Sequence, residues 1–220
     1  NMPLQAELPW PADGQWDGAE SRRQILREEL QLPQNQTIWI LQGAGINVDR
    51  GAEELVDAAA LCPEVELLIV GSGDVLADLK QNCTSRGITN VRFLGRVERA
   101  QLQRLTQAAN LGFSLDKPKS ANYRWSLPNK VFDYLQAGIP MVVSDLVEVS
   151  RLLRQTGAGV VLEELSAAAI ASAARDLISP DHYAAACQAA RAAAHRYHWG
   201  NECQVWHRLI DRLEGINTHH

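Results

Sequence analysis

The stretch from Ser126 to Asp145 reads SLPNKVFDYLQAGIPMVVSD and decides the fold class of this chain. Pro128 suits the first turn of a helix, where the N–H group that proline lacks would have no partner. Gly138 and Pro140 then stop the helix after about ten residues. The apolar run that follows at once is typical of a short buried strand. The stretch therefore predicts a helix that leads directly into a strand, as in an α/β domain.

The first turns of this predicted helix carry Asn129, Lys130 and Asp133. A helix N-terminus exposes unpaired backbone N–H groups and the positive end of the helix dipole, and both favour phosphate. Lys130 adds a full positive charge, and Asp133 lies one turn further, at a depth suited to a sugar hydroxyl. The helix start therefore predicts a phosphate site with a polar neighbour.

The rest of the chain alternates short aliphatic runs with amphipathic ones. The predicted strands are 37–42, 66–70, 91–94, 111–114, 141–144 and 159–162. The predicted helices between them are 51–61, 74–86, 99–108, 128–137 and 148–155, with another at 21–30. This alternation predicts one α/β domain built on a doubly wound, Rossmann-like parallel sheet of about six strands, with helices on both faces.

Three C-terminal helices are expected after the sixth strand, at about 166–178, 180–197 and 201–214. The last one carries Val205, Trp206, Leu209, Ile210 and Leu213 at helical spacing. Such a stripe predicts a helix that lies along an apolar groove. By the same argument Trp199 and Trp206 are expected to anchor this helix by packing.

Composition sets further bounds on function. The 220 residues are 46% hydrophobic and carry a formal net charge of −5, with no basic block, so a nucleic-acid partner is not expected. No apolar run is long enough to span a bilayer, and no signal peptide opens the chain. Four scattered cysteines without a CxxC pair indicate free thiols in a reducing compartment, so a cytoplasmic location is expected.

The residues around Lys130 resemble a family motif. Leu127-Pro128-Asn129-Lys130, Gly138 and Pro140 resemble the LPNKxFEYxxxGxP pattern of group 1 (family four) glycosyltransferases of the GT-B fold. The resemblance covers most of the chain. It implies that residues 36–220 are the C-terminal, donor-binding lobe, that residues 1–35 are a linker between lobes, and that the N-terminal acceptor-binding lobe is missing.

The resemblance also implies a function. Family members transfer a sugar from a UDP-, GDP- or ADP-sugar to an acceptor, with retention of configuration and without a metal or another cofactor. Bacterial polysaccharide biosynthesis is a typical setting. The resemblance implies that this lobe alone is inactive and that any peripheral membrane association occurs through the absent lobe.

Site residues follow from the same resemblance. Gly43 and Gly45 match the loop after the first strand, and Arg50 takes the place of its usual lysine. Arg50 and Lys130 are then the catalytic cations that stabilise charge on the leaving diphosphate. The remaining donor contacts are expected at the backbone of Gly71, Arg96 and Val97, at Asn129, and at Asp133 against the ribose.

Three departures from the family pattern keep alternatives open. Trp125 stands where the first glutamate of the E-x7-E motif is expected, and Asp133 is the shorter form of the second. Neither Gly45 nor Ile46 supplies the second basic residue of the first loop. A sugar-nucleotide epimerase-like GT-B protein, or a degenerate lobe used for protein association, therefore remains possible.

Overall fold

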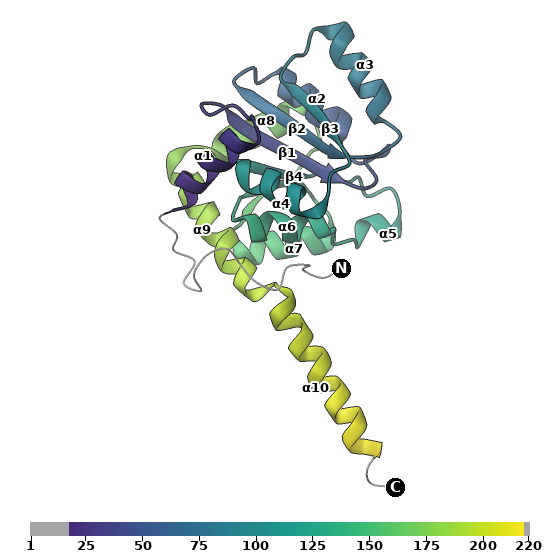
Figure 1. Ribbon diagram of the computed structural model, residues 1–220. Coiled ribbons are helices and arrows are strands. Elements are labelled where there is room, and N and C mark those ends of the chain that lie inside the picture. Colours follow the sequence, from purple (N-terminus) through teal and green to yellow (C-terminus); the bar gives the residue numbers. More distant parts are fainter. Residues whose placement is uncertain (1–17, 218–220) are drawn as a thin grey trace.

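The computed structural model describes residues 18–217 and contains one six-stranded, wholly parallel sheet (Figure 1). Its strands are β1 Thr37–Gly43, β2 Val65–Gly71, β3 Val91–Gly95, β4 Leu111–Ser114, β5 Met141–Ser144 and β6 Gly159–Leu162. The strand order is β3-β2-β1-β4-β5-β6. The doubly wound sheet predicted from the sequence is confirmed.

The helices fall close to the predicted ranges. They are α1 Ala19–Glu29, α2 Ala52–Ala60, α3 Leu76–Arg86, α4 Arg99–Ala108, α5 Ala121–Arg124, α6 Asn129–Ala137, α7 Val147–Thr156, α8 Ala167–Leu177, α9 Pro180–Arg196 and α10 Trp199–Asn217. The sequence did not predict α5. This single turn depends on Ser120, whose hydroxyl accepts a hydrogen bond from the backbone N–H of Tyr123.

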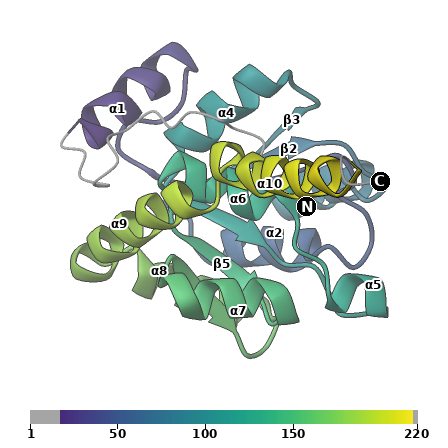
Figure 2. The ribbon, with the colours of Figure 1, turned by 90° about the horizontal axis from the view of Figure 1, so that it is seen from below.

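The helices cover both faces of the sheet. Buried residues of α1, α4, α6, α7 and α9 form one core with side chains from one face, and α2, α3 and α8 form a second core with the other (Figures 1 and 2). The central strand β1 contributes Ile38 and Ile40 to the first core and Trp39 and Leu41 to the second. A strand covered on both faces has no polar face, which explains its continuous apolar sequence.

The strand order reverses between β1 and β4, which pair directly with Trp39 opposite Leu111. Ligands of open α/β sheets bind beyond the carboxyl ends of the strands at such a switch point. Tyr134 fixes α6 there, because its hydroxyl proton is shared between the carbonyl oxygens of Phe113, 3.0 Å away, and Ile40, 3.3 Å away. Its ring lies against Gly112, where a Cβ atom would come within 2.4 Å. The fold thus holds the start of α6 over the switch point.

Part of the predicted linker belongs to the folded body. Leu26 of α1 and Leu32 are buried in the first core. The guanidinium of Arg27 donates to the carbonyl of Ala108 at 3.0 Å and to Oδ1 of Asn110 at 2.6 Å. Residues 1–17 of that segment lie outside the described residues, so the linker between lobes stays a prediction.

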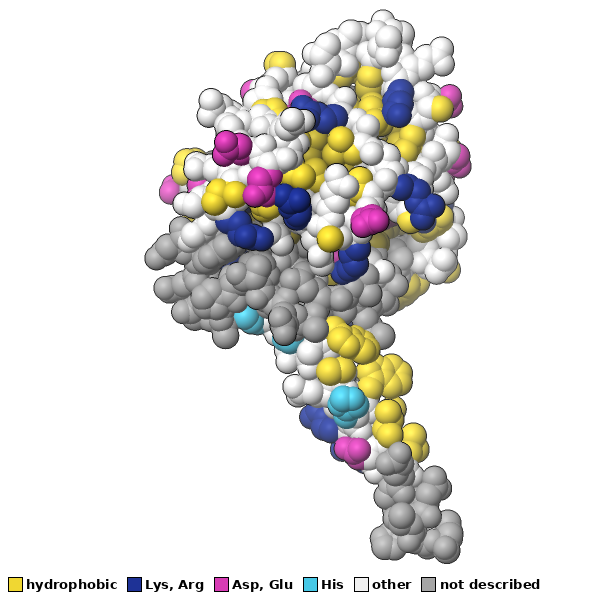
Figure 3. Space-filling view, in the orientation of Figure 1, with side chains coloured by type: hydrophobic (Ala, Val, Ile, Leu, Met, Phe, Trp, Pro, Cys, Tyr) yellow, Lys and Arg dark blue, Asp and Glu magenta, His cyan; other side chains and the backbone are white. Residues whose placement is uncertain are grey.

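The terminal helix differs from its prediction. Instead of lying along a groove, α10 extends away from the sheet, and its apolar residues gather along one side of it (Figures 1 and 3). Trp206 is 51% exposed and Leu213 is 55% exposed. The expected packing anchors are therefore wrong for this chain, because no element within residues 18–217 covers that face. No helix in the same residues is long and apolar enough to cross a membrane.

Candidate nucleotide-sugar site

A pocket of about 320 Å³ opens beyond the carboxyl ends of β1 and β2, beside the first turns of α4 and α6. Its lining consists of Gln42, Gly43, Ala44, Val70, Gly71, Arg96, Val97, Arg99, Leu102, Asn129, Lys130 and Asp133. Seven of these residues are predicted donor contacts: Gly43, Gly71, Arg96, Val97, Asn129, Lys130 and Asp133. The structure thus brings most of the predicted site residues to one cavity.

Gly71 makes the wall of this pocket possible. Its φ is +137°, a conformation that favours glycine, and an added Cβ atom would come within 1.8 Å of the carbonyl oxygen of Gly43. The two strand ends therefore approach each other closely where the pocket opens. Gly43 has no such requirement, since its added Cβ would make only ordinary contacts, with a side-chain carbon of Ile46 at 3.5 Å and the backbone nitrogen of Gly45 at 3.9 Å.

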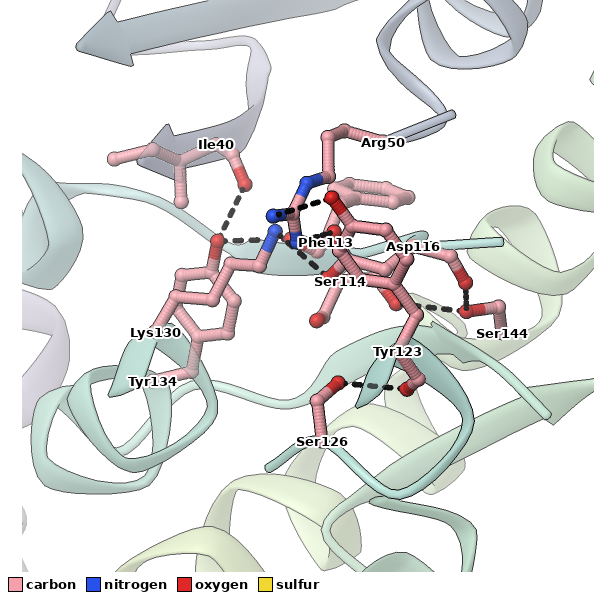
Figure 4. Close-up of polar contacts among 10 residues, drawn as sticks. All are labelled: Ile40, Arg50, Phe113, Ser114, Asp116, Tyr123, Ser126, Lys130, Tyr134 and Ser144. Atoms are coloured by element: carbon pink, nitrogen blue, oxygen red, sulfur yellow. Dashed lines mark hydrogen bonds and ion pairs between the residues drawn. The ribbon is translucent and has the colours of Figure 1, made fainter. Parts of the chain in front are cut away.

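Arg50 and Lys130 meet at one buried carboxylate, that of Asp116 (Figure 4). Arg50 Nη1 lies 2.7 Å from Oδ1 of Asp116, and Lys130 Nζ lies 3.4 Å from Oδ2. Asp116 itself is fully buried just beyond β4. Two cations from distant parts of the chain therefore lie side by side beyond the carboxyl end of the central strand β4.

The two cations have different surroundings. Burial lowers the pKa of Lys130, and the nearby charge of Asp116 opposes that effect. Arg50 has a further partner in Tyr123 of α5, whose ring centroid lies 4.4 Å from the guanidinium carbon. The stacked ring and the carboxylate fix the direction of the Arg50 side chain.

Asp133 belongs to a separate network behind the pocket. Its Oδ2 accepts a hydrogen bond from Nε2 of Gln42 at 2.8 Å, and Gln42 in turn accepts one from Thr106. Its Oδ1 lies 3.8 Å from Arg99. Burial raises the pKa of Asp133, while Arg99 and Gln42 act in the opposite direction. The carboxylate is thus held in place and faces the pocket from α6.

Two predicted residues lie outside the lining of the pocket: Gly45 and Arg50. Arg50 nevertheless lies beside the pocket, because it shares the carboxylate of Asp116 with Lys130, which lines the pocket. Sequence reasoning missed Gln42, Arg99 and the pairing role of Asp116. Gln42 had a usable signal, since it is a polar residue inside an otherwise apolar strand. Trp125, which replaces an expected acid, is 59% exposed directly after α5.

Comparison with known proteins identifies the family. The family model described as glycosyl transferases group 1 matches residues 41–180, well over half of the chain. The chain belongs to the group 1 glycosyltransferases. The matched region contains both cations, Asp116, and the whole lining of the pocket.

A curated protein and several solved structures are also similar to this chain. Chitobiosyldiphosphodolichol beta-mannosyltransferase of Yarrowia lipolytica is 30% identical over 139 residues, which are 56% of this chain and 28% of that protein. HepE of Anabaena, solved in complex with UDP and glucose, has a TM-score of 0.69 at 20% identity, over 91% of this chain and 54% of its own. Sucrose-phosphate synthase of Thermosynechococcus elongatus has a TM-score of 0.70 at 19% identity, over 87% of this chain and 49% of its own.

The solved structures show the fold. The predicted GT-B-like lobe is confirmed at the level of the fold, because both solved structures share this fold over most of the chain. The chain spans about half the length of those two solved chains, and 28% of the curated mannosyltransferase.

Proposed function

We propose that this chain is the donor-binding lobe of a retaining, metal-independent glycosyltransferase that uses a nucleoside-diphosphate sugar. One observation carries the proposal: the cations Arg50 and Lys130 converge beside a pocket that most of the other predicted donor contacts line. A cation pair at the switch point of the sheet suits a diphosphate.

Each part of the proposed site has a chemical task. Negative charge builds up on the leaving diphosphate during transfer, and Lys130, Arg50 and the first backbone amides of α6 stabilise it. Asp133 accepts hydrogen bonds from ribose hydroxyls. Arg96 and Val97 line the pocket, and in this proposal their backbone contacts the base. The acceptor and the remaining catalytic groups come from a second lobe, so this lobe binds donor without transferring sugar.

The choice of nucleotide starts from the structural neighbours. HepE has been solved with UDP and with UDP-glucose. We therefore propose UDP as the first probe, with GDP and ADP beside it. Because the base is read by the backbone in this proposal, the side chains of the pocket do not select among the three bases.

The test is a titration of the chain with millimolar UDP, GDP and ADP, followed by amide chemical shifts. We expect shifts at Gly43, Gly71 and Asn129 with at least one nucleotide. Lys130→Gln should weaken binding about tenfold or more, since a charge-assisted contact with phosphate is lost. The matched control is Lys80→Gln on α3, an exposed lysine away from the pocket, which should leave binding unchanged. No shift with any of the three nucleotides would contradict the proposal.

A further inference from the structure

Asp116 has two cationic partners, one for each of its oxygens, although it is fully buried. Its backbone is fixed as well, because the hydroxyl of Ser144 donates a hydrogen bond to the carbonyl of Asp116 at 2.6 Å. Figure 4 shows the guanidinium of Arg50 and the ammonium of Lys130 converging on this carboxylate. The side chain of Lys130 is itself only 13% exposed.

Electrostatics give this arrangement a function. Two neighbouring cations repel each other, and a buried amine readily loses its proton unless an anion lies close by. The charged groups that act on Lys130 are Asp116 beyond β4 and Arg50 from the loop between β1 and α2. Tyr123 of α5 contacts Arg50, and Asp133 lines the same pocket from the helix of Lys130. Two cations and one carboxylate leave a net charge of about +1 to meet a phosphate.

We propose that Asp116 is the positioning residue of the phosphate site, which keeps Lys130 charged and holds Lys130 and Arg50 together before the donor arrives. This inference rests on the proposed function, in which those two cations receive the diphosphate. Asp116 does not touch the phosphate, since like charges repel. It acts through the two cations.

A competing role makes the opposite prediction. If Asp116 only competed with phosphate for Arg50 and Lys130, its removal would free both cations. Asp116→Asn would then bind UDP more tightly at every pH. A positioning role requires weaker binding instead, with a loss that grows as the pH rises, because Lys130 loses its proton sooner without the carboxylate.

The first measurement is direct and needs no ligand. The chain has only four lysines, Lys80, Lys117, Lys119 and Lys130, so its side-chain ¹³Cε signals are few and are assigned by single substitutions. We expect Asp116→Asn to shift the titration of the Lys130 signal to lower pH and to leave Lys80 unchanged. The matched control is Glu164→Gln, which removes an exposed acid after β6 and should shift neither the Lys130 signal nor the Lys80 signal. An unchanged Lys130 titration in Asp116→Asn overturns the inference.

The second measurement is UDP affinity at pH 7.5 and pH 9, with each variant compared with wild type at the same pH. We expect Asp116→Asn to lose more affinity at pH 9 than at pH 7.5, by about tenfold at the higher pH. In a Lys130→Gln background the same substitution should add no pH dependence, because the titrating amine is absent. Equal losses at both pH values would indicate a structural role alone and overturn the inference.

A second variant covers the case in which Asp116→Asn does not fold. Arg50→Gln changes a partly exposed side chain and removes the cation that disfavours a charged Lys130. It should move the Lys130 titration to higher pH, and an unchanged titration would refute the coupling of the three groups.

The two proposals fail in different ways. If wild type binds no nucleoside diphosphate, the proposed function fails, while the lysine titration still reports on Asp116. If wild type binds UDP and the Lys130 titration is the same in wild type and in Asp116→Asn, only the positioning role fails.

Discussion

At the scale of single residues, the site depends on buried polar groups whose charge is controlled by their neighbours. Asp133 is an example, because Gln42 and Arg99 each engage one of its oxygens while burial works against its ionisation. A carboxylate kept in such surroundings reduces the stability of the folded chain. The proposed hydrogen bond to a ribose hydroxyl would account for a carboxylate at position 133.

Asp133→Asn is expected to stabilise the folded chain at neutral pH and to weaken nucleotide binding. The pKa of Asp133 is raised above its ordinary value of 3.8, so the folded chain binds this proton more tightly than the unfolded chain does. Stability therefore falls as the pH rises from about 3.8 through the folded pKa, and the penalty is complete above it. We expect a melting temperature about 2 °C higher than wild type at pH 7.

This gain should fade as the pH falls below about 3.8, where Asp133 becomes protonated in the unfolded state as well. Differential scanning calorimetry across that range measures it, with Glu164→Gln as the control for loss of one exposed charge. A variant less stable than wild type at pH 7 would show that the contacts with Gln42 and Arg99 outweigh the burial of the charge.

Residues of the site were predictable from sequence where the signal is local. Lys130 and Asp133 sit in the first turns of one helix, so a helix start was enough to place both beside a cavity. The pairing of Asp116 with Arg50 and Lys130 was not predictable in this way. It joins three segments that meet only in the folded sheet, and a single acid in a loop carries no local signal.

At the scale of elements, the pocket depends on how closely the ends of β1 and β2 approach. Gly71 lies opposite Gly43 in the last pair of their ladder, with its φ at +137°. Any side chain there meets the backbone of β1 rather than a movable side chain. The position therefore requires glycine for two separate reasons.

Gly71→Ala is expected to destabilise the chain by about 3 kcal/mol or more, through a backbone clash added to conformational strain. Gly87→Ala is the matched control. Its φ is +67°, but nothing lies within 4 Å of the added Cβ, so we expect a loss of about 1 kcal/mol from strain alone. Urea unfolding followed by circular dichroism compares the two. Equal losses would mean that the strand ends separate easily.

Sequence predicted the regular elements well, because short aliphatic runs between amphipathic ones leave little choice. Strands β4, β5 and β6 have the predicted bounds. The single turn of α5 escaped prediction, since a four-residue helix shows no periodicity and depends on one Ser120 cap. The position of α10 also escaped it, because an apolar stripe indicates that a helix face is to be covered without showing what covers it.

At the scale of the whole molecule, we expect α10 to contribute little to the stability of this chain. Its exposed residues Leu209 and Leu213 are 47% and 55% accessible. The double substitution Leu209→Gln and Leu213→Gln should change the free energy of unfolding by less than about 0.5 kcal/mol. Leu135→Ala, at a fully buried position of α6, should cost about 3 kcal/mol.

Urea unfolding measures both variants under the same conditions. A loss above about 2 kcal/mol in the double variant would show that the α10 stripe is packed in the folded chain. The expected small change would fit a helix whose apolar side does not serve the described domain.

The sheet order has a consequence for how the chain is made. β1 lies between β2 and β4, yet β2 follows it soon and β4 only after two further helices. Until Leu111 and Gly112 emerge from the ribosome, one edge of β1 at Trp39 and Ile40 has no strand to pair with. The free backbone N–H and C=O groups of such an unpaired edge can pair with a strand of another chain. We therefore expect nascent chains or proteolytic fragments that end between β3 and β4 to be prone to aggregate at β1, and synthesis through Ser114 to protect that edge.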